Sequence, residues 1–391
     1  MRALVFGWMT ILALFASACA GDDGAGAPRP SAGGSVSGDV SASALAAAPY
    51  RLDPLPGLAA AGRSYANGLN EAGTVVGAAS KMADPTSSLH ATRWSPGAAP
   101  RDLGLLAGGA TSAGAGINAL GQVTGGAAVS TVASHAFLYR GDPGPMIDIG
   151  WLALGGLTPA FQSIAGTGIN DAGQVSGTSP LQLGAPSYSA FTRAFVWQSG
   201  HMTDLGSLGD TNSSGLAINA RGWVTGSTST PTAAMHAFLW TGTTMTDLDV
   251  CPGATTSEGA ALTAAGDVAG MCFFPQANGY PSGHRAFRHA FYRAVSGTMI
   301  DLGTLGGLKS QAFGVATGGV VVGKSDVPTT VTDARTRAFV WTAAAGMRDL
   351  NMLVTAPGWL LTEAHAVNGR GQIAGNGLLD GAPRAFLLTP Q

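Results

Sequence analysis

The sequence predicts an all-β fold, a seven-bladed β-propeller of four-stranded blades, from three observations. One pattern of turn and strand residues recurs seven times between residue 49 and the C-terminus. Its successive turn positions are 44 to 53 residues apart, close to the length of one four-stranded blade. The composition agrees, because 59 of the 391 residues are glycine and only 11% are charged, as expected for short strands joined by many tight turns.

The first 48 residues predict an export signal followed by a tether. Residues 1–18 combine one positive charge, an apolar run too short to span a bilayer and small residues at their end. The junction resembles a bacterial lipobox, which predicts lipidation at Cys19; the alternative is an ordinary secretory signal cleaved near Ala18 or Ala20. Residues 19–48 are rich in Gly, Ala, Ser and Pro, which predicts a flexible tether before the propeller domain of residues 49–391.

These features place the protein at the bacterial cell envelope, lipid-anchored at the outer membrane or cell surface, or outside the cell as a secreted protein. We expect contact with a membrane only through the lipid anchor. Lys and Arg total 20 against 22 Asp and Glu, without a basic cluster, which argues against a nucleic-acid partner.

Each repeat opens with an Asn-x-x-Gly turn between its first and second strands, and a second glycine follows four residues later. Asn and Gly tolerate the left-handed backbone that hairpin turns require. The turn asparagines are Asn70, Asn118, Asn170, Asn219 and Asn368. The fifth and sixth copies carry Thr263 and Ala316 instead, and we expect these departures to affect only the geometry of the turn.

The third strand of each repeat begins with a basic residue, an alanine and an apolar or aromatic run, as in RAFVW from Arg193. Side chains alternate along a strand, so Arg193 and Phe195 share one face and Ala194 lies on the other. The recurrent alanine predicts a close approach of neighbouring sheets. It occurs at Ala91, Ala136, Ala194, Ala237, Ala290, Ala338 and Ala385.

The basic residue of the third strand is expected to pair with an aspartate of the fourth strand in every blade. The last copy ends before its aspartate, and Asp53, which precedes the first turn, is expected to replace it, so that an N-terminal strand closes the ring. Pairs spread around a ring cannot converge on one substrate, so we interpret them as structural. They are His90 with Asp102, His135 with Asp148, Arg193 with Asp204, His236 with Asp247, His289 with Asp301, Arg337 with Asp349 and Arg384 with Asp53.

The segments HAFLW, GINDAGQVSG and MTDLGSLG resemble the extracellular HAF repeat family of bacterial secreted proteins. The resemblance extends over residues 50 to 391. It implies export and repetition, and it carries no catalytic residues.

The sequence contains no HExxH, Asp-x-Asp calcium loop, GxSxG or phosphate-binding glycine loop, so it assigns no catalytic residue, metal ligand or cofactor. Cys251 and Cys272 are expected to form a disulfide because the protein is predicted to be exported. The alternatives are two free buried thiols or a metal site.

The connections that vary in length between copies predict the binding face. They join the second strand to the third, and one blade to the next, and both kinds emerge at the same end of a blade. The longest contains the candidate ligand-binding residues Phe273, Phe274, Gln276, Asn278, Tyr280, His284 and Arg285. Alternatively, Phe273 and Phe274 only cover the edge of the blade.

We therefore expect an envelope-tethered or secreted propeller that acts as a binding or scaffold module for a protein or glycan. The alternative is a propeller hydrolase or lyase acting on extracellular polysaccharide, with site residues drawn from several blades. A third possibility is an envelope protein with a purely structural role.

Overall fold

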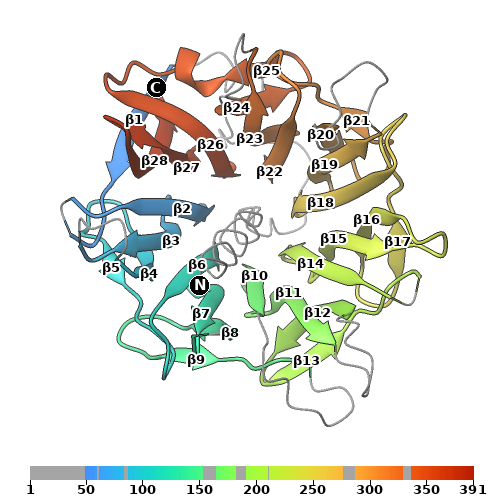
Figure 1. Cartoon of the computed structure of the whole chain (residues 1–391), viewed down its shortest axis with the longest axis horizontal. Helices are drawn as coiled ribbons and strands as arrows, with labels where there is room; N and C mark the ends of the chain where they lie inside the picture. Colours follow the sequence, from blue (N-terminus) through green and yellow to red (C-terminus); the bar gives the residue numbers. More distant parts are fainter. Residues whose placement is uncertain are drawn as a thin grey trace, which may run out of the picture.

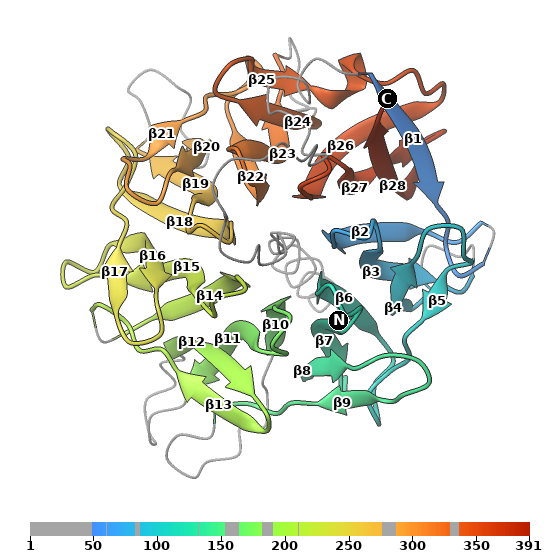
Figure 2. The ribbon, with the colours of Figure 1, turned by 180° about the vertical axis from the view of Figure 1, so that it is seen from behind.

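In the computed structural model, seven antiparallel sheets of four strands form a ring, as Figures 1 and 2 show from its two sides. The structure describes residues 49–59, 61–82, 87–131, 133–152, 164–181, 191–209, 211–275, 287–328 and 336–391. The predicted seven-bladed propeller is confirmed. The predicted signal peptide, Cys19 and the tether lie outside the described residues.

Blades 1 to 4 each consist of four consecutive strands, with the first strand innermost in the ring (Figure 1). Blade 1 contains β2 (Ser64–Leu69), β3 (Val75–Ser80), β4 (Leu89–Trp94) and β5 (Arg101–Asp102). Blade 2 contains β6 (Ser112–Ile117), β7 (Val123–Ala128), β8 (Ser134–Tyr139) and β9 (Met146–Asp148). Blade 3 contains β10 (Ala165–Ile169), β11 (Val175–Leu181), β12 (Phe191–Gln198) and β13 (His201–Asp204). Blade 4 contains β14 (Ser213–Ile218), β15 (Val224–Ser229), β16 (Met235–Trp240) and β17 (Met245–Asp247).

Blades 5 and 6 follow the same order, and blade 7 takes its outer strand from the beginning of the domain. Blade 5 contains β18 (Thr256–Leu262), β19 (Val268–Phe274), β20 (Phe287–Arg293) and β21 (Ile300–Asp301). Blade 6 contains β22 (Ser310–Ala316), β23 (Val320–Asp326), β24 (Thr336–Thr342) and β25 (Gly346–Asp349), followed by the short 3₁₀ helix η1 (Leu350–Met352). Blade 7 contains β26 (Trp359–Val367), β27 (Ile373–Leu379), β28 (Ala382–Pro390) and β1 (Tyr50–Leu55).

The ring is closed by pairing between β1 and β28, as the sequence predicted. Tyr50 lies opposite Pro390 and Leu55 opposite Ala385. The amide of Gln391 donates to the carbonyl of Pro49 at 3.0 Å, so the two ends of the domain are hydrogen-bonded to each other.

The recurrent alanine and the aromatic residue after it explain how neighbouring blades pack. All seven alanines of this motif are fully buried. Across an interface, the alanine of one blade packs in the same cluster as the phenylalanine of the next: Ala194 with Phe238, and Ala290 with Phe339. The small side chain admits the large one at the close packing density of a protein interior.

The two ends of the blades differ in their connections. In an antiparallel four-stranded blade, the turns between first and second strands lie at one end, which we call the turn face. The connections between second and third strands, and those between blades, emerge at the opposite end, which we call the loop face.

Candidate functional site

The turn asparagines link each blade to the next. The side-chain Nδ2 of each buried asparagine donates to the backbone oxygen at the same position of the following blade, at 2.9 to 3.1 Å. Its Oδ1 accepts backbone N–H groups of its own turn, as Asn70 does from Thr74 at 3.0 Å. One amide therefore satisfies the turn and joins two blades, an inter-blade role that the single-repeat pattern did not reveal.

This series of amide bonds is interrupted at two consecutive interfaces. Thr263 accepts the Asp267 amide through Oγ1 at 3.0 Å, so it preserves the turn, but it has no amide to donate to blade 6. Ala316 provides neither group, and its turn uses Gly318 and Gly319 at positive φ. The expectation that these substitutions affect only turn geometry is therefore wrong, because the asparagine they replace also holds the next blade.

A serine at the start of the inner strand forms a second recurring link. In five interfaces, the backbone N–H of the motif alanine donates to this serine of the following blade, at 2.8 to 3.0 Å. The serines are Ser64, Ser112, Ser213, Ser257 and Ser310.

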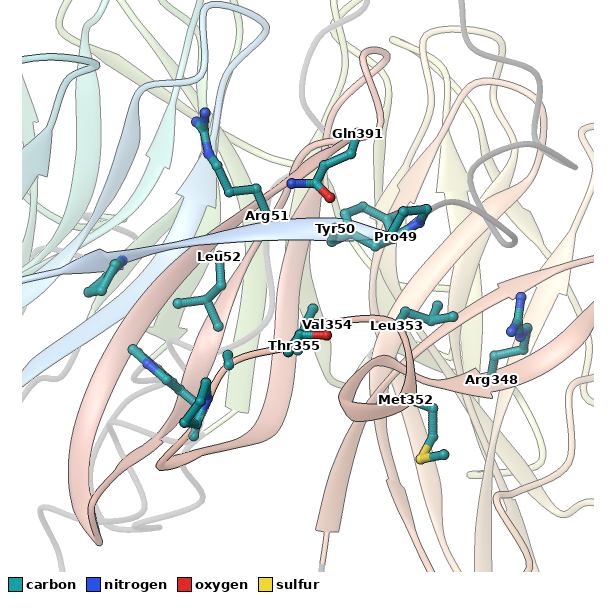
Figure 3. A pocket seen from close by; sticks show the side chains of 14 residues that line it. Pro49, Tyr50, Arg51, Leu52, Arg348, Met352, Leu353, Val354, Thr355 and Gln391 are labelled. Carbon is teal, nitrogen blue, oxygen red and sulfur yellow. The ribbon is translucent and has the colours of Figure 1, made fainter.

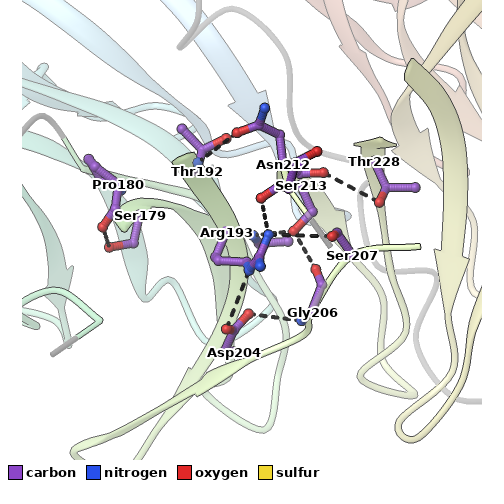
Figure 4. Close-up of polar contacts among 12 residues, drawn as sticks. Ser179, Pro180, Thr192, Arg193, Asp204, Gly206, Ser207, Asn212, Ser213 and Thr228 are labelled. Atoms are coloured by element: carbon purple, nitrogen blue, oxygen red, sulfur yellow. Dashed lines mark hydrogen bonds and ion pairs between the residues drawn. The ribbon is translucent and has the colours of Figure 1, made fainter. Parts of the chain in front are cut away.

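Six of the seven predicted pairs between a basic residue and an aspartate are brought together within their blades, at 2.7 to 3.8 Å. In blade 3, Arg193 Nε lies 3.6 Å from Asp204 Oδ2, and Figure 4 shows its guanidinium between Asp204 and Ser207. Asp204 also accepts the amide of Gly206 at 2.8 Å. The same acceptor role recurs in all six pairs, so each aspartate also shapes the connection to the next blade.

The seventh pair does not form. In the other blades the aspartate lies opposite the residue two positions after the basic one, but in blade 7 that residue, Phe386, lies opposite Pro54. Asp53 is shifted by one residue, which turns its side chain to the other face of the sheet. It pairs instead with Arg51 at 2.8 Å, and Arg384 donates to the carbonyl of Gly62 at 2.9 Å.

Cys251 and Cys272 form the expected disulfide, and both residues are fully buried. The predicted ligand loop begins just beyond it. Phe274 packs against the cluster that contains Cys272, and its ring lies 5.0 Å from that of His289. This contact agrees with the alternative in which Phe274 covers the blade edge. Phe273 lies opposite Arg288 in the pairing of β19 with β20 and is partly exposed. The remaining candidates lie outside the described residues: Gln276, Asn278, Tyr280, His284 and Arg285.

A pocket of about 650 Å³ lies where the ring closes. Figure 3 shows β1 along one side and the segment containing Val354 and Thr355 along the other. Burial raises the pKa of Tyr50 to about 12, so its hydroxyl stays protonated at neutral pH. Arg51 is engaged with Asp53, and Met352 is 80% exposed. No group of buried ionisable side chains converges on this pocket in the described chain.

The inner strands carry a second repeated feature, a β-bulge at the third residue before the turn position. Bulges re-aim side chains and are frequent beside binding sites. The bulge residues are Asn67, Ala115, Thr167, Leu216, Ala260, Phe313 and His365. We call the residue two positions before the bulge residue the wall residue. In blades 1 to 7 the wall residues are Tyr65, Ala113, Ala165, Ser214, Glu258, Gln311 and Glu363.

The wall and bulge positions are uncharged in blades 1 to 4. In blades 5 to 7 they include two glutamates, a glutamine and a histidine. We define the polar sector as Glu258, Gln311, Phe313, Glu363 and His365 together with Lys324, which lies opposite Gln311 on β23. Four of these residues form one cluster between blades 6 and 7. The rings of Phe313 and His365 stack with centroids 4.8 Å apart and an interplanar angle of 4°.

Two side chains, those of Lys324 and His365, contact Glu363 in this cluster. Lys324 Nζ lies 2.6 Å from Oε1 and 5.4 Å from the centre of the Phe313 ring, and His365 Nε2 lies 3.0 Å from Oε2. His365 is 1% exposed, whereas about a quarter of the Lys324 and Glu363 side chains remains accessible, at 24% and 27%. Ligand contact is therefore possible at the lysine and the carboxylate but not at the imidazole.

The two carboxylates of the polar sector have opposite electrostatic environments. Burial raises the pKa of Glu363, but the hydrogen bond and charge of His365, together with Lys324, outweigh it and hold the pKa well below its ordinary value. Burial raises the pKa of Glu258, and the Ser227 hydroxyl at 3.5 Å and the charge of Arg288 only partly oppose it. The sector thus has one carboxylate whose pKa is lowered by its partners and one whose pKa is raised by burial.

The described residues contain neither a candidate metal site nor a candidate membrane-spanning helix. No set of three or more His, Cys, Asp or Glu side chains in this part of the chain is placed to hold a metal ion. None of its helices has the length and apolar character needed to cross a membrane.

Comparison of the sequence with known protein families and with individually curated proteins finds no match. Solved structures do match. An oligogalacturonate lyase in complex with manganese has a TM-score of 0.51 at 10% identity, over 88% of this chain and 97% of that one. TolB from Acinetobacter baumannii has a TM-score of 0.41 at 12% identity. This match covers 70% of this chain and 62% of TolB, less than two thirds of the length of TolB. A gluconolactonase from Xanthomonas campestris has a TM-score of 0.40 at 12% identity, over 96% of this chain and 98% of that one. At such identities the likeness shows the β-propeller fold alone.

Proposed function

We propose that this protein is a non-catalytic binding propeller of the cell envelope that holds an extracellular glycan against the polar sector of blades 5 to 7. The predicted export signal and tether, and the resemblance of the repeats to the HAF repeats of bacterial secreted proteins, support a ligand outside the cytoplasm. An anchor at Cys19 would keep the ligand at the cell surface.

The observation that carries the proposal is the asymmetry of the inner strands. All seven blades have the same bulge, yet only blades 5 to 7 place Glu258, Gln311 and Glu363 at the wall position. Blades 2 to 4 have Ala, Ala and Ser there, which shows that the scaffold does not require large polar side chains. Among these side chains the Glu363 carboxylate and the Lys324 ammonium are about a quarter accessible, and they provide the acceptor and donors that fix the orientation of a hydroxylated ligand. Gln311 is buried, and its amide lies 2.9 Å from Met271 Sδ.

The cluster is better suited to binding than to proton transfer. Glu363 already accepts from Lys324 and His365, which disfavours its protonation, and His365 is too buried to reach a substrate. A pre-formed, fully paired network of this kind provides a rigid surface for recognition.

One observation favours the alternative of a hydrolase or lyase. The pKa of Glu258 is raised and that of Glu363 is lowered, the combination found in acid and base carboxylates, although the two residues belong to blades 5 and 7, which are not neighbours. In this alternative Glu258 would supply the proton.

A glycan array probed with the full chain tests the proposal, followed by titration of each bound saccharide. We expect Lys324→Met and Glu363→Gln to weaken binding at least tenfold, because each removes an accessible hydrogen-bonding group from the polar sector. Ser214→Ala, at the wall position of blade 4, is the matched control and should bind like the wild type.

Two results would decide against the proposal. Equal binding by all variants would exclude the polar sector as the site. Release of new reducing ends or unsaturated products from a bound saccharide, lost in Glu258→Gln, would establish the enzymatic alternative.

A further inference from the structure

The seam between blades 5 and 6 brings two cationic residues together near the polar sector. Arg288, in the third strand of blade 5, forms an isolated parallel bridge with Lys309, which immediately precedes the inner strand of blade 6. Both residues are partly exposed. Paired residues of a parallel bridge carry their side chains on the same face, so the two charges lie side by side.

Neither cation is neutralised by an ion pair within the described chain, unlike Lys324 beside Glu363. The Nε of Arg288 is buried and has no hydrogen-bond partner there. The acids that act electrostatically on Arg288 are Asp326 and Glu258. Burial raises the pKa of both acids, and the charges of Lys309, Arg288 and Lys324 partly oppose the shift at Asp326.

The other seams show that the charge of Arg288 is not part of the scaffold, whereas the position of Lys309 is also cationic in blade 1, where it is Arg63. Blade 3 has Thr192 and Asn212 at the same two positions, joined by a hydrogen bond of 3.0 Å from the Thr192 amide to Asn212 Oδ1. The position of Arg288 is uncharged in the six other blades, where it is Leu89, Ser134, Thr192, Met235, Thr336 and Pro383. An arginine that is partly desolvated and has no ion pair among the described residues is costly unless another group pairs with it.

We infer that Arg288 and Lys309 form an oxyanion subsite that binds the carboxylate of an acidic saccharide whose hydroxyl groups contact the polar sector. This inference rests on the proposed function, because it identifies the class of glycan that the sector holds. The guanidinium suits a carboxylate because its planar donors match the two oxygens. Lys309 adds a point charge, and both residues lie toward the loop face, at or just before the start of their strands.

The test is titration of the full chain with an oligoglucuronate and with the same oligosaccharide after reduction of its carboxyl groups. We expect the acidic form to bind at least tenfold more tightly than the reduced form, and its affinity to fall with added salt. Arg288→Gln and Lys309→Gln should each remove most of this preference. Arg370→Gln is the matched control, because it removes an exposed positive charge on the turn face.

The outcomes separate this inference from the proposed function. If both saccharides bind equally and Glu363→Gln weakens both, the glycan site stands and the oxyanion subsite is overturned. If neither saccharide binds, and an acidic peptide of matched charge does, the subsite recognises a protein and both statements fail. Thermal unfolding of each variant, with midpoints close to wild type, excludes loss of folding as the cause.

Discussion

The side-chain amide of Asn368 in blade 7 donates to the backbone carbonyl of Asn70 in blade 1 at 3.1 Å. This bond crosses the interface where the ring closes, and it repeats the bond that links blade 1 to blade 2, from Asn70 to Asn118. Closure is therefore held by the outer strand β1 and, at the inner strands, by the same amide that joins ordinary neighbours.

The first prediction exchanges asparagine and threonine at equivalent turns. Asn170→Thr keeps a side-chain oxygen for the turn, as Thr263 does, but loses the donor to Asn219 O at 2.9 Å. We expect it to lower the free energy of unfolding by about 1 kcal/mol, the usual contribution of one hydrogen bond. Thr263→Asn, the reciprocal change, should raise it by a similar amount by supplying a donor to blade 6. Denaturant unfolding measures both, and a loss of stability in Thr263→Asn would contradict the inter-blade role.

The second prediction concerns Asp204. Complete burial of its pair with Arg193 would make Asp204→Ala cost about 3 to 5 kcal/mol. The structure gives a smaller expectation, because 27% of Asp204 is exposed and Arg193 also donates to the carbonyl of Thr211 and the hydroxyl of Ser207. We expect about 1 to 2 kcal/mol, mainly from the lost Gly206 contact. Asp204→Asn, which retains an acceptor for that amide, should recover part of it, and equal unfolding midpoints for wild type and Asp204→Ala would show that the pair contributes nothing.

The third prediction concerns the disulfide. Cys251 and Cys272 are 21 residues apart, and a crosslink over such a loop stabilises by about 3 kcal/mol in the chain-entropy model. Replacing both cysteines with alanine should lower the free energy of unfolding by roughly this amount, with circular dichroism unchanged. Alkylation of the unfolded, unreduced protein followed by intact mass is the direct check. Modification of both Cys251 and Cys272 under these conditions would disprove the bond.

The fourth prediction is a pH dependence centred on Glu363. Its folded pKa is lower than its unfolded value of about 4.3, so its stabilising contribution is complete above that pH and is lost as the pH falls toward the folded pKa. Below about pH 4.3 the melting temperature of the wild type should therefore fall more steeply than that of Glu363→Gln. Asp102 and Asp301, whose pKa values are also lowered, are common to both proteins and cancel in the comparison. Parallel curves from pH 2 to 6 would show that Glu363 is not stabilised by its two partners.

The sequence predicted the ring, its closure and the disulfide because these depend on features that repeat or stand out along the chain. The predicted pair of Asp53 with Arg384 failed because the sequence pattern does not specify the register of β1 on β28. A shift of one residue leaves the pattern intact but moves the Asp53 side chain to the other face of the sheet. The pairing of Pro54 with Phe386 shows this shift. The pattern within one repeat predicts only the turn role of the asparagines. Their second contact, a hydrogen bond to the next blade, joins two repeats and does not appear in that pattern.

The polar sector was missed for a related reason. Its wall residues are about 50 residues apart in the sequence, and each one alone resembles an ordinary polar residue of a strand. Aligning the seven copies on the turn position provides the missing signal, because one column then reads Tyr, Ala, Ala, Ser, Glu, Gln and Glu. The stacking of Phe313 on His365 depends on the bulge, which no residue pattern in a single copy predicted.

The pairing of β1 with β28 also sets an order of events during synthesis. The ribosome makes β1 first among the described strands and β28 last, and at 5 to 20 residues per second the interval is on the order of 20 to 70 s. Throughout this interval Tyr50–Leu55 is a strand without its partner, and blade 7 cannot be completed by any local hairpin. Such a strand edge can pair with the wrong chain. A chaperone that covers residues 50–55 until translation reaches residue 390 would therefore increase the yield of closed rings without contacting the finished protein.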